Sequence, residues 1–121
     1  MDEVIAPDGS KVMPLLRAAG GSLARFELAE GRTSRAVAHR SVEELWYIVG
    51  GQGEMWRKGK TDDAETVTRL EPGIAIALPV GTHFQFRSFG PGPLTAVAVT
   101  MPPWPGEREA FPVKGKWQED L

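Results

Sequence analysis

Short segments in which apolar and polar residues alternate run along most of the chain, and turn residues separate them at intervals of roughly 8–12 residues. No stretch shows the sustained 3.6-residue period of an amphipathic helix. Glu71-Pro72-Gly73 illustrates the turns, because proline presets φ and glycine supplies the positive φ of a type II turn. The pattern predicts an all-β sandwich or barrel with strands at Lys11–Leu16, Leu23–Leu28, Ser34–His39, Glu44–Val49, Gly53–Lys58, Glu65–Leu70, Gly73–Leu78, His83–Phe89 and Leu94–Met101.

The C-terminal segment, residues 102–121, differs from the rest because it begins with several prolines. Proline lacks a backbone donor, so this tail is predicted to form neither a regular helix nor a central strand. Its tryptophans, Trp104 and Trp117, are expected to pack over the barrel or against a second subunit. The tail and the first predicted strand are therefore the candidate interfaces of a dimer.

Length and composition indicate one ordinary globular domain spanning residues 1–121. Hydrophobic residues make up 41% and charged residues 25%, as in soluble proteins. The net charge is −2 without a basic block, which argues against nucleic-acid or anionic-membrane partners. The absence of cysteine excludes disulfides and thiolate metal sites.

The N-terminal residues lack the basic and apolar regions of a secretory signal. The longest apolar run, Ile74–Val80, is too short to span a bilayer. A cytoplasmic protein without a membrane partner is therefore expected.

One segment, at about residues 31–51, has a distinctive spacing. Its framework is Gly31, five residues, Val37, one residue, His39, four residues, Glu44, six residues and Gly51. This spacing resembles the first motif of the cupin superfamily, G(X)5HXH(X)3-4E(X)6G, with valine at the first histidine position.

A second segment, at about residues 73–88, resembles the other cupin motif, G(X)5PXG(X)2H(X)3N. Gly73, Pro79 and Gly81 match its first half, whereas Phe84 and Ser88 stand at the histidine and asparagine positions. The two motifs follow one another in the expected order. The resemblance implies a small single-domain cupin, an all-β double-stranded β-helix that forms a jelly-roll barrel.

Strand alternation predicts which side chains enter the barrel, because every second residue shares a face. His83, Gln85 and Arg87 should then point away from the lumen. A mostly apolar lumen with a few convergent polar groups is typical of a small-molecule site. The inward set is predicted to be Arg35, Val37, His39, Glu44, Trp46, Phe84, Phe86 and Ser88.

The resemblance also raises the question of a metal, since cupins with complete motifs use three histidines and a glutamate. Here His39 and Glu44 remain, and two ligands are too few for a tight site. A bulge that turned His83 inward would give two histidines and a carboxylate, a set known from non-haem iron enzymes. Without a bulge, His83 is a turn or interface residue. Two cofactor states therefore stay open: none, or a divalent transition metal such as Fe, Mn, Zn or Ni.

Three functions remain open. In the first, His39 and Glu44 are proton-transfer residues of a metal-independent isomerase, epimerase, cyclase or lyase. In that case Arg35 would hold an anionic group of the substrate, and the remaining inward residues would bind it. The second is a metal-dependent cupin, either a dioxygenase or a sugar-isomerase-like enzyme, using His39, Glu44 and His83.

The third function is a non-catalytic module that binds a metabolite. Val37 and Phe84 favour the first and third functions, because neither side chain ligates a metal. Glu44 could equally be a structural group paired with Arg35 or a histidine. In each case the partner is a small molecule, and the resemblance to small cupins implies a homodimer.

Overall fold

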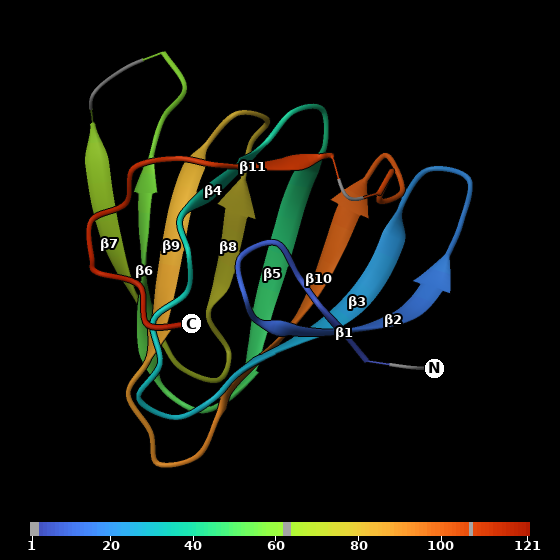
Figure 1. Ribbon diagram of the computed structural model, residues 1–121. Helices are drawn as coiled ribbons and strands as arrows, with labels where there is room; N and C mark the ends of the chain where they lie inside the picture. Colours follow the sequence, from blue (N-terminus) through green and yellow to red (C-terminus); the bar gives the residue numbers. More distant parts are fainter. Residues whose placement is uncertain (1–2, 62–63, 107) are drawn as a thin grey trace.

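The computed structural model describes residues 3–61, 64–106 and 108–121. Two antiparallel sheets face each other across one interior (Figure 1). No described segment forms a helix that could span a membrane. One sheet has the order β1 (Val4–Ile5), β2 (Lys11–Arg17), β3 (Ser22–Leu28), β10 (Leu94–Met101), β5 (Glu43–Gly50) and β8 (Ala75–Leu78); the other has β11 (Ala110–Pro112), β4 (Val37–His39), β9 (His83–Ser88), β6 (Gly53–Lys58) and β7 (Glu65–Leu70).

The strand pairs are nested along the chain. β3 pairs with β10, β4 with β9, β5 with β8 and β6 with β7. Successive pairs alternate between the two sheets, since β3–β10 and β5–β8 lie in one and β4–β9 and β6–β7 in the other. The chain therefore winds around the barrel as a pair of antiparallel strands. This is the jelly-roll barrel predicted from the sequence, and the all-β expectation is confirmed.

The strand predictions hold for most of the chain, with two additions and three strands that are shorter than predicted, since β8 begins at Ala75 and β9 ends at Ser88. β1 and β11 were not predicted. β11 lies in the proline-rich tail, at a sheet edge where Pro112 opposes Val37, and an edge tolerates the missing donor. The predicted strand Ser34–His39 begins only at Val37, because Ser34 and Arg35 donate their backbone N–H groups to Phe86 and Asp8.

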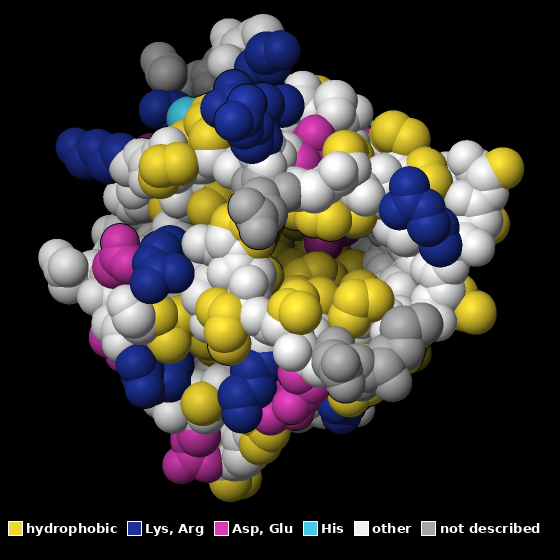
Figure 2. Space-filling view, turned by 45° about the vertical axis from the view of Figure 1, so that its right-hand side comes forward, with side chains coloured by type: hydrophobic (Ala, Val, Ile, Leu, Met, Phe, Trp, Pro, Cys, Tyr) yellow, Lys and Arg dark blue, Asp and Glu magenta, His cyan; other side chains and the backbone are white. Residues whose placement is uncertain are grey.

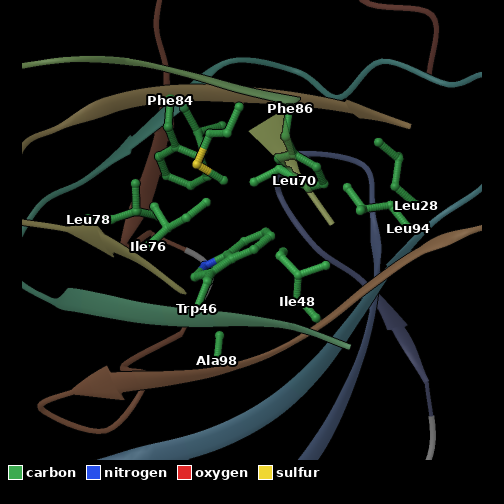
Figure 3. Close-up of a cluster of buried hydrophobic side chains, with 13 residues drawn as sticks. Leu28, Trp46, Ile48, Leu70, Ile76, Leu78, Phe84, Phe86, Leu94 and Ala98 are labelled. Carbon is green, nitrogen blue, oxygen red and sulfur yellow. The ribbon is translucent and has the colours of Figure 1, made fainter. Parts of the chain in front are cut away.

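A cluster of buried apolar side chains fills the interior between the sheets, with Trp46 near its centre (Figure 3). The Trp46 ring stacks on Phe26 at 5.1 Å between centroids and meets Phe86 edge-on at 5.0 Å. Burial alternates strictly along β5, which places Glu44, Trp46 and Ile48 inside.

The tail crosses the outside of the five-stranded sheet and is fixed by Gln85. This side chain was expected to face away from the lumen, and it lies buried beneath the tail. Its Nε2 donates to the carbonyls of Ser34 and Trp117, and its Oε1 accepts from the backbone N–H groups of Lys116 and Trp117. The Arg87 guanidinium stacks 4.2 Å from the Trp117 ring centroid. Trp117 thus packs on the barrel of its own chain.

The outer face of β5 exposes Leu45, Tyr47 and Val49 to about half of their full extent. A stripe of this kind is common on proteins that associate, but single exposed apolar residues are also ordinary. The homodimer and the cytoplasmic location expected from the sequence stay predictions.

Candidate functional site

A cavity of about 760 Å³ opens at one end of the interior. Figure 2 shows this hollow, lined mainly by hydrophobic side chains, with acidic side-chain atoms in its depth. The six-stranded sheet contributes most of the wall, and the other sheet adds Val37, His39, Phe84 and Ala110. Small or short side chains leave the space open, among them Val12, Pro14, Ala24 and Ala98.

Among the buried polar side chains that line this cavity are His39 at the end of β4 and Glu44 at the start of β5. The strands belong to different sheets, so a short turn brings the side chains together across the interior. His39 Nδ1 lies 3.5 Å from Glu44 Oε1. The Trp46 indole N–H donates to the other oxygen, Glu44 Oε2. His39 is 6% exposed and Glu44 is 2% exposed.

Burial sets the protonation of this pair. It raises the pKa of Glu44 to about 8; the Trp46 hydrogen bond opposes this shift, and the nearby Asp8 carboxyl adds to it. Burial also lowers the pKa of His39 to about 4, against the attraction of the Glu109 carboxylate. At neutral pH the pair is therefore a carboxylic acid beside an uncharged imidazole.

The His39 ring is held by aromatic neighbours. Phe84 and Trp104 meet it edge-on, at centroid distances of 5.3 and 5.2 Å. Trp104 comes from the tail and also lines the cavity, so the tail completes the wall beside His39. Its packing on the barrel agrees with one of the two sequence expectations.

Glu109 shapes the turn between β4 and β5 that joins the pair. Its carboxylate accepts the backbone N–H groups of Ser41 and Val42 and the Ser41 hydroxyl. Although burial raises the pKa of Glu109, these hydrogen bonds together lower it below its ordinary value. A carboxylate with such partners fixes the backbone on which both His39 and Glu44 are mounted.

The predicted inward set divides in two. Val37, His39, Glu44 and Phe84 line the cavity, around the place where the complete cupin motifs would put a metal. The other members, Trp46, Phe86 and Ser88, are buried in the packed part of the interior and are not part of the cavity wall. Their assignment to substrate binding stays a prediction, with Trp46 acting on the site through Glu44.

Arg35 does not lie in the lumen, where strand alternation predicted it. Its side chain is 43% exposed, and its Nε lies 3.1 Å from Glu119 Oε2 in the tail. It also donates to the Leu121 carbonyl. The reason is that β4 begins at Val37, so the alternation does not extend back to residue 35.

His83 stays outside the cavity wall. β9 pairs with β6 in unbroken register from His83 opposite Lys58 to Ser88 opposite Gly53, so the bulge that the metal hypothesis required is not there. Among the described residues no group of three or more histidine, aspartate or glutamate side chains is placed to hold a metal ion. His39, Glu44 and His83 are not brought together, and the residues present do not fit a transition metal.

Asp8 is a buried ionisable residue of the cavity wall that the sequence interpretation missed. It lies in the loop between β1 and β2 and is 5% exposed. Pro7-Asp8-Gly9 reads as a turn, and a turn signal does not reveal that the carboxyl faces inward. Burial raises the pKa of Asp8, whereas its bonds to Ser10 and the charge of Arg35 oppose that shift.

No family model and no curated protein matches the sequence. Solved structures do resemble it. KdgF from Halomonas sp. has a TM-score of 0.69 at 18% identity, covering 84% of this chain and 86% of that one. An uncharacterised Klebsiella pneumoniae protein with a double-stranded β-helix domain also gives 0.69, at 17% identity over 88% and 85%.

A third structure, Streptomyces PAC13 solved as a variant with uridine, gives a TM-score of 0.72 at 13% identity, covering 93% of this chain and 84% of that one. Identities this low establish the architecture alone. Together with the nested strand pairs, they show that the chain has the cupin-type double-stranded β-helix fold.

Proposed function

We propose that the chain is an enzyme that moves protons on an uncharged small molecule bound in the cavity. One observation carries the proposal: an acid and a base, His39 and Glu44, lie 3.5 Å apart in a buried apolar cavity of about 760 Å³. A general acid and base act best when each has the correct protonation state at the working pH. A neutral imidazole can accept a proton, and a protonated carboxyl can donate one.

The pair suits a carbon–hydrogen bond next to a carbonyl group. His39 takes the proton from carbon while Glu44 gives its proton to the carbonyl oxygen, which produces an enol. This leaves an imidazolium and a carboxylate side by side, and their attraction across 3.5 Å partly offsets the cost of charging two buried groups. If the reacting carbon also carries a hydroxyl group, the intermediate is an enediol; return of the His39 proton to its other carbon and of a hydroxyl proton to Glu44 then completes an isomerisation and restores both groups. Return of the proton to the original carbon, with the enol proton returned to Glu44, exchanges its hydrogen or, on the opposite face, epimerises it.

The cavity wall supports an uncharged substrate. An anion would lose its hydration there without a buried cation to replace it. Arg35, the expected anion partner, lies outside the cavity. Arg17 does line it, but its side chain is exposed and donates to the Trp104 carbonyl. PAC13, which has the same fold, was solved with uridine, an uncharged molecule.

Hydrogen–deuterium exchange in D₂O tests this function without knowledge of the product. The probes are acetophenone, phenylacetone and hydroxyacetone, with pyruvate and oxaloacetate as anionic comparators, and proton NMR follows the signals next to the carbonyl. The protein should accelerate exchange of at least one uncharged probe. Glu44→Gln and His39→Asn should each slow the accelerated rate by about 10²–10⁴-fold.

The matched control is Glu71→Gln, which removes an exposed carboxyl outside the cavity wall and should exchange like the wild type. The proposal fails if the wild type exchanges no probe faster than buffer. It also fails if Glu44→Gln and His39→Asn keep the full rate. Probe binding without any exchange would instead support a non-catalytic binding module.

A further inference from the structure

The loop between β1 and β2 places a third ionisable side chain on the cavity wall. The loop is closed by two backbone hydrogen bonds, from Ala6 N–H to the Ser10 carbonyl and from Gly9 N–H to the Ala6 carbonyl. Asp8 lies between them, buried and facing the cavity. The Asp8 carbonyl also accepts the backbone N–H of Arg35, which fixes the loop against the segment that leads into β4.

The two oxygens of the Asp8 carboxyl are in different situations. Oδ1 accepts two hydrogen bonds, from the Ser10 backbone N–H at 2.9 Å and from the Ser10 hydroxyl at 2.6 Å. No described residue donates to Oδ2. Because Oδ1 already accepts twice, the proton of an uncharged Asp8 lies on Oδ2. That oxygen can then donate a hydrogen bond to a ligand or accept one from it.

Ionisable neighbours of Asp8 are Arg35, whose charge acts on it from outside the cavity, and Glu44, which shares the cavity wall. Arg35 is itself engaged by Glu119 and by the Leu121 carbonyl. Buried carboxyls that influence each other in this way resist simultaneous ionisation. Asp8 and Glu44 therefore both favour hydrogen bonding to uncharged groups.

Val37 is an apolar residue on the same cavity wall as Asp8 and His39. The Asp8 loop is bonded to the backbone of Arg35, and His39 follows four residues later, a span of at most roughly 13 Å in extended chain. In the sequence Val37 lies between Arg35 and His39, and its side chain lines the cavity. An apolar part of a ligand can rest on Val37 while its two ends reach polar groups.

We propose that Asp8 is a specificity-determining residue that binds a second oxygen of the substrate through Oδ2. The substrate class is an uncharged carbonyl compound with a hydroxyl or carbonyl group at its far end and an apolar portion between. This inference rests on the proposed ligand site. It adds that the cavity selects for two separated oxygens rather than for one.

A matched pair of probes tests the inference by binding alone. Para-hydroxyacetophenone and para-methylacetophenone have similar size, and the hydroxyl is the added polar group. Their dissociation constants are measured by calorimetric titration, at a pH where the phenol is uncharged. The wild type should prefer the hydroxyl compound by about tenfold, the value of one buried hydrogen bond.

Variants assign that preference to Asp8. Asp8→Ala should abolish it, whereas Asp8→Asn should retain most of it because the amide can still accept from Ser10 and bond the ligand. Ser10→Ala controls for disturbance of the loop, since it removes a hydrogen bond to Oδ1 and leaves Oδ2 in place. Unfolding in urea confirms that each variant is folded.

Equal binding of the two probes by the wild type would overturn the inference, as would a preference that survives in Asp8→Ala. The readout is independent of turnover. A preference that depends on Asp8, with no proton exchange in the wild type, would refute the proposed catalysis and keep Asp8 as a binding residue. Proton exchange that requires His39 and Glu44, without a binding preference for the hydroxyl compound, would support the proposed catalysis and refute the role of Asp8.

Discussion

The two ends of the barrel interior lie between the same two sheets but are built in opposite ways. At one end Trp46, Phe86, Leu70 and Ile48 fill the space between the sheets, and none is more than 2% exposed (Figure 3). At the other end the same two sheets enclose an open cavity. β9 contributes to both, with Phe86 in the packed end and Phe84 on the cavity wall.

The ends also differ in charge chemistry, since Asp8, His39 and Glu44 all lie on the cavity wall. Burial of ionisable groups costs stability, and the packed end supplies the apolar contacts that offset this cost. Buried ionisable groups and open space are unfavourable in a core, and they are expected mainly at binding or catalytic sites. The comparison thus separates residues that stabilise the barrel from residues proposed to bind or react with a ligand.

The sharpest test of this division compares two phenylalanines. Phe86 lies in the packed end, whereas Phe26 is partly buried and borders the cavity. Phe86→Ala should lower the free energy of unfolding by about 3–5 kcal/mol, because it removes a large buried side chain and leaves a void. Phe26→Ala should cost about half as much, since it enlarges an opening that already exists.

Urea unfolding measures both values. Equal losses would mean that the cavity wall is as tightly packed as the rest of the interior, which would contradict the division. Phe26→Ala should in addition weaken probe binding, because the Phe26 ring is part of the cavity wall.

A second test uses the pH dependence of stability. In the unfolded chain Glu44 has its ordinary pKa of 4.5, whereas in the folded chain the pKa is about 8. Between these values the unfolded state binds fewer protons, so the free energy of unfolding falls as the pH rises. Asp8 contributes in the same direction, because its pKa is raised as well. His39 acts oppositely, and only between about pH 4 and 6.5.

The effect of Glu44 is therefore clearest between pH 6.5 and 8. Over this window the wild type should lose up to about 2 kcal/mol of unfolding free energy, and Glu44→Gln should remove most of that loss. Urea unfolding at a series of pH values measures it. If the variant and the wild type show parallel curves, the Glu44 carboxyl is not held protonated.

The part of the cavity wall around His39 and Glu44 could be predicted from the sequence, because side chains alternate along a strand once the register is known. Val37, His39, Glu44 and Phe84 all lie within paired strands, and all four line the cavity as expected. The jelly-roll barrel was predicted from the resemblance of the two motifs to those of cupins, and the nested strand pairs have that architecture.

Two residues could not be placed in this way. Arg35 lies before the first residue of β4, where hydrogen bonds to another segment replace the strand pattern. Asp8 belongs to a loop whose position depends on contacts with Arg35 and with Leu121, whose side chain packs against Gly9. Such contacts join the two ends of the sequence, and no local pattern encodes them.

The smallest expected effect concerns Arg35, which lies outside the cavity wall and is bonded through its backbone to the Asp8 loop. Its ion pair with Glu119 is more than two-fifths exposed on both sides, and exposed pairs contribute at most about 1 kcal/mol. Arg35→Gln should therefore change the free energy of unfolding by less than that amount. It should leave the affinity for para-hydroxyacetophenone unchanged, because the side chain does not line the cavity.

Arg69→Gln, which breaks the exposed Arg69–Glu71 pair elsewhere, is the matched control. A large loss of probe affinity in Arg35→Gln alone would mean that the binding site extends past Asp8 to the tail, and the cavity would then accept an anionic group after all.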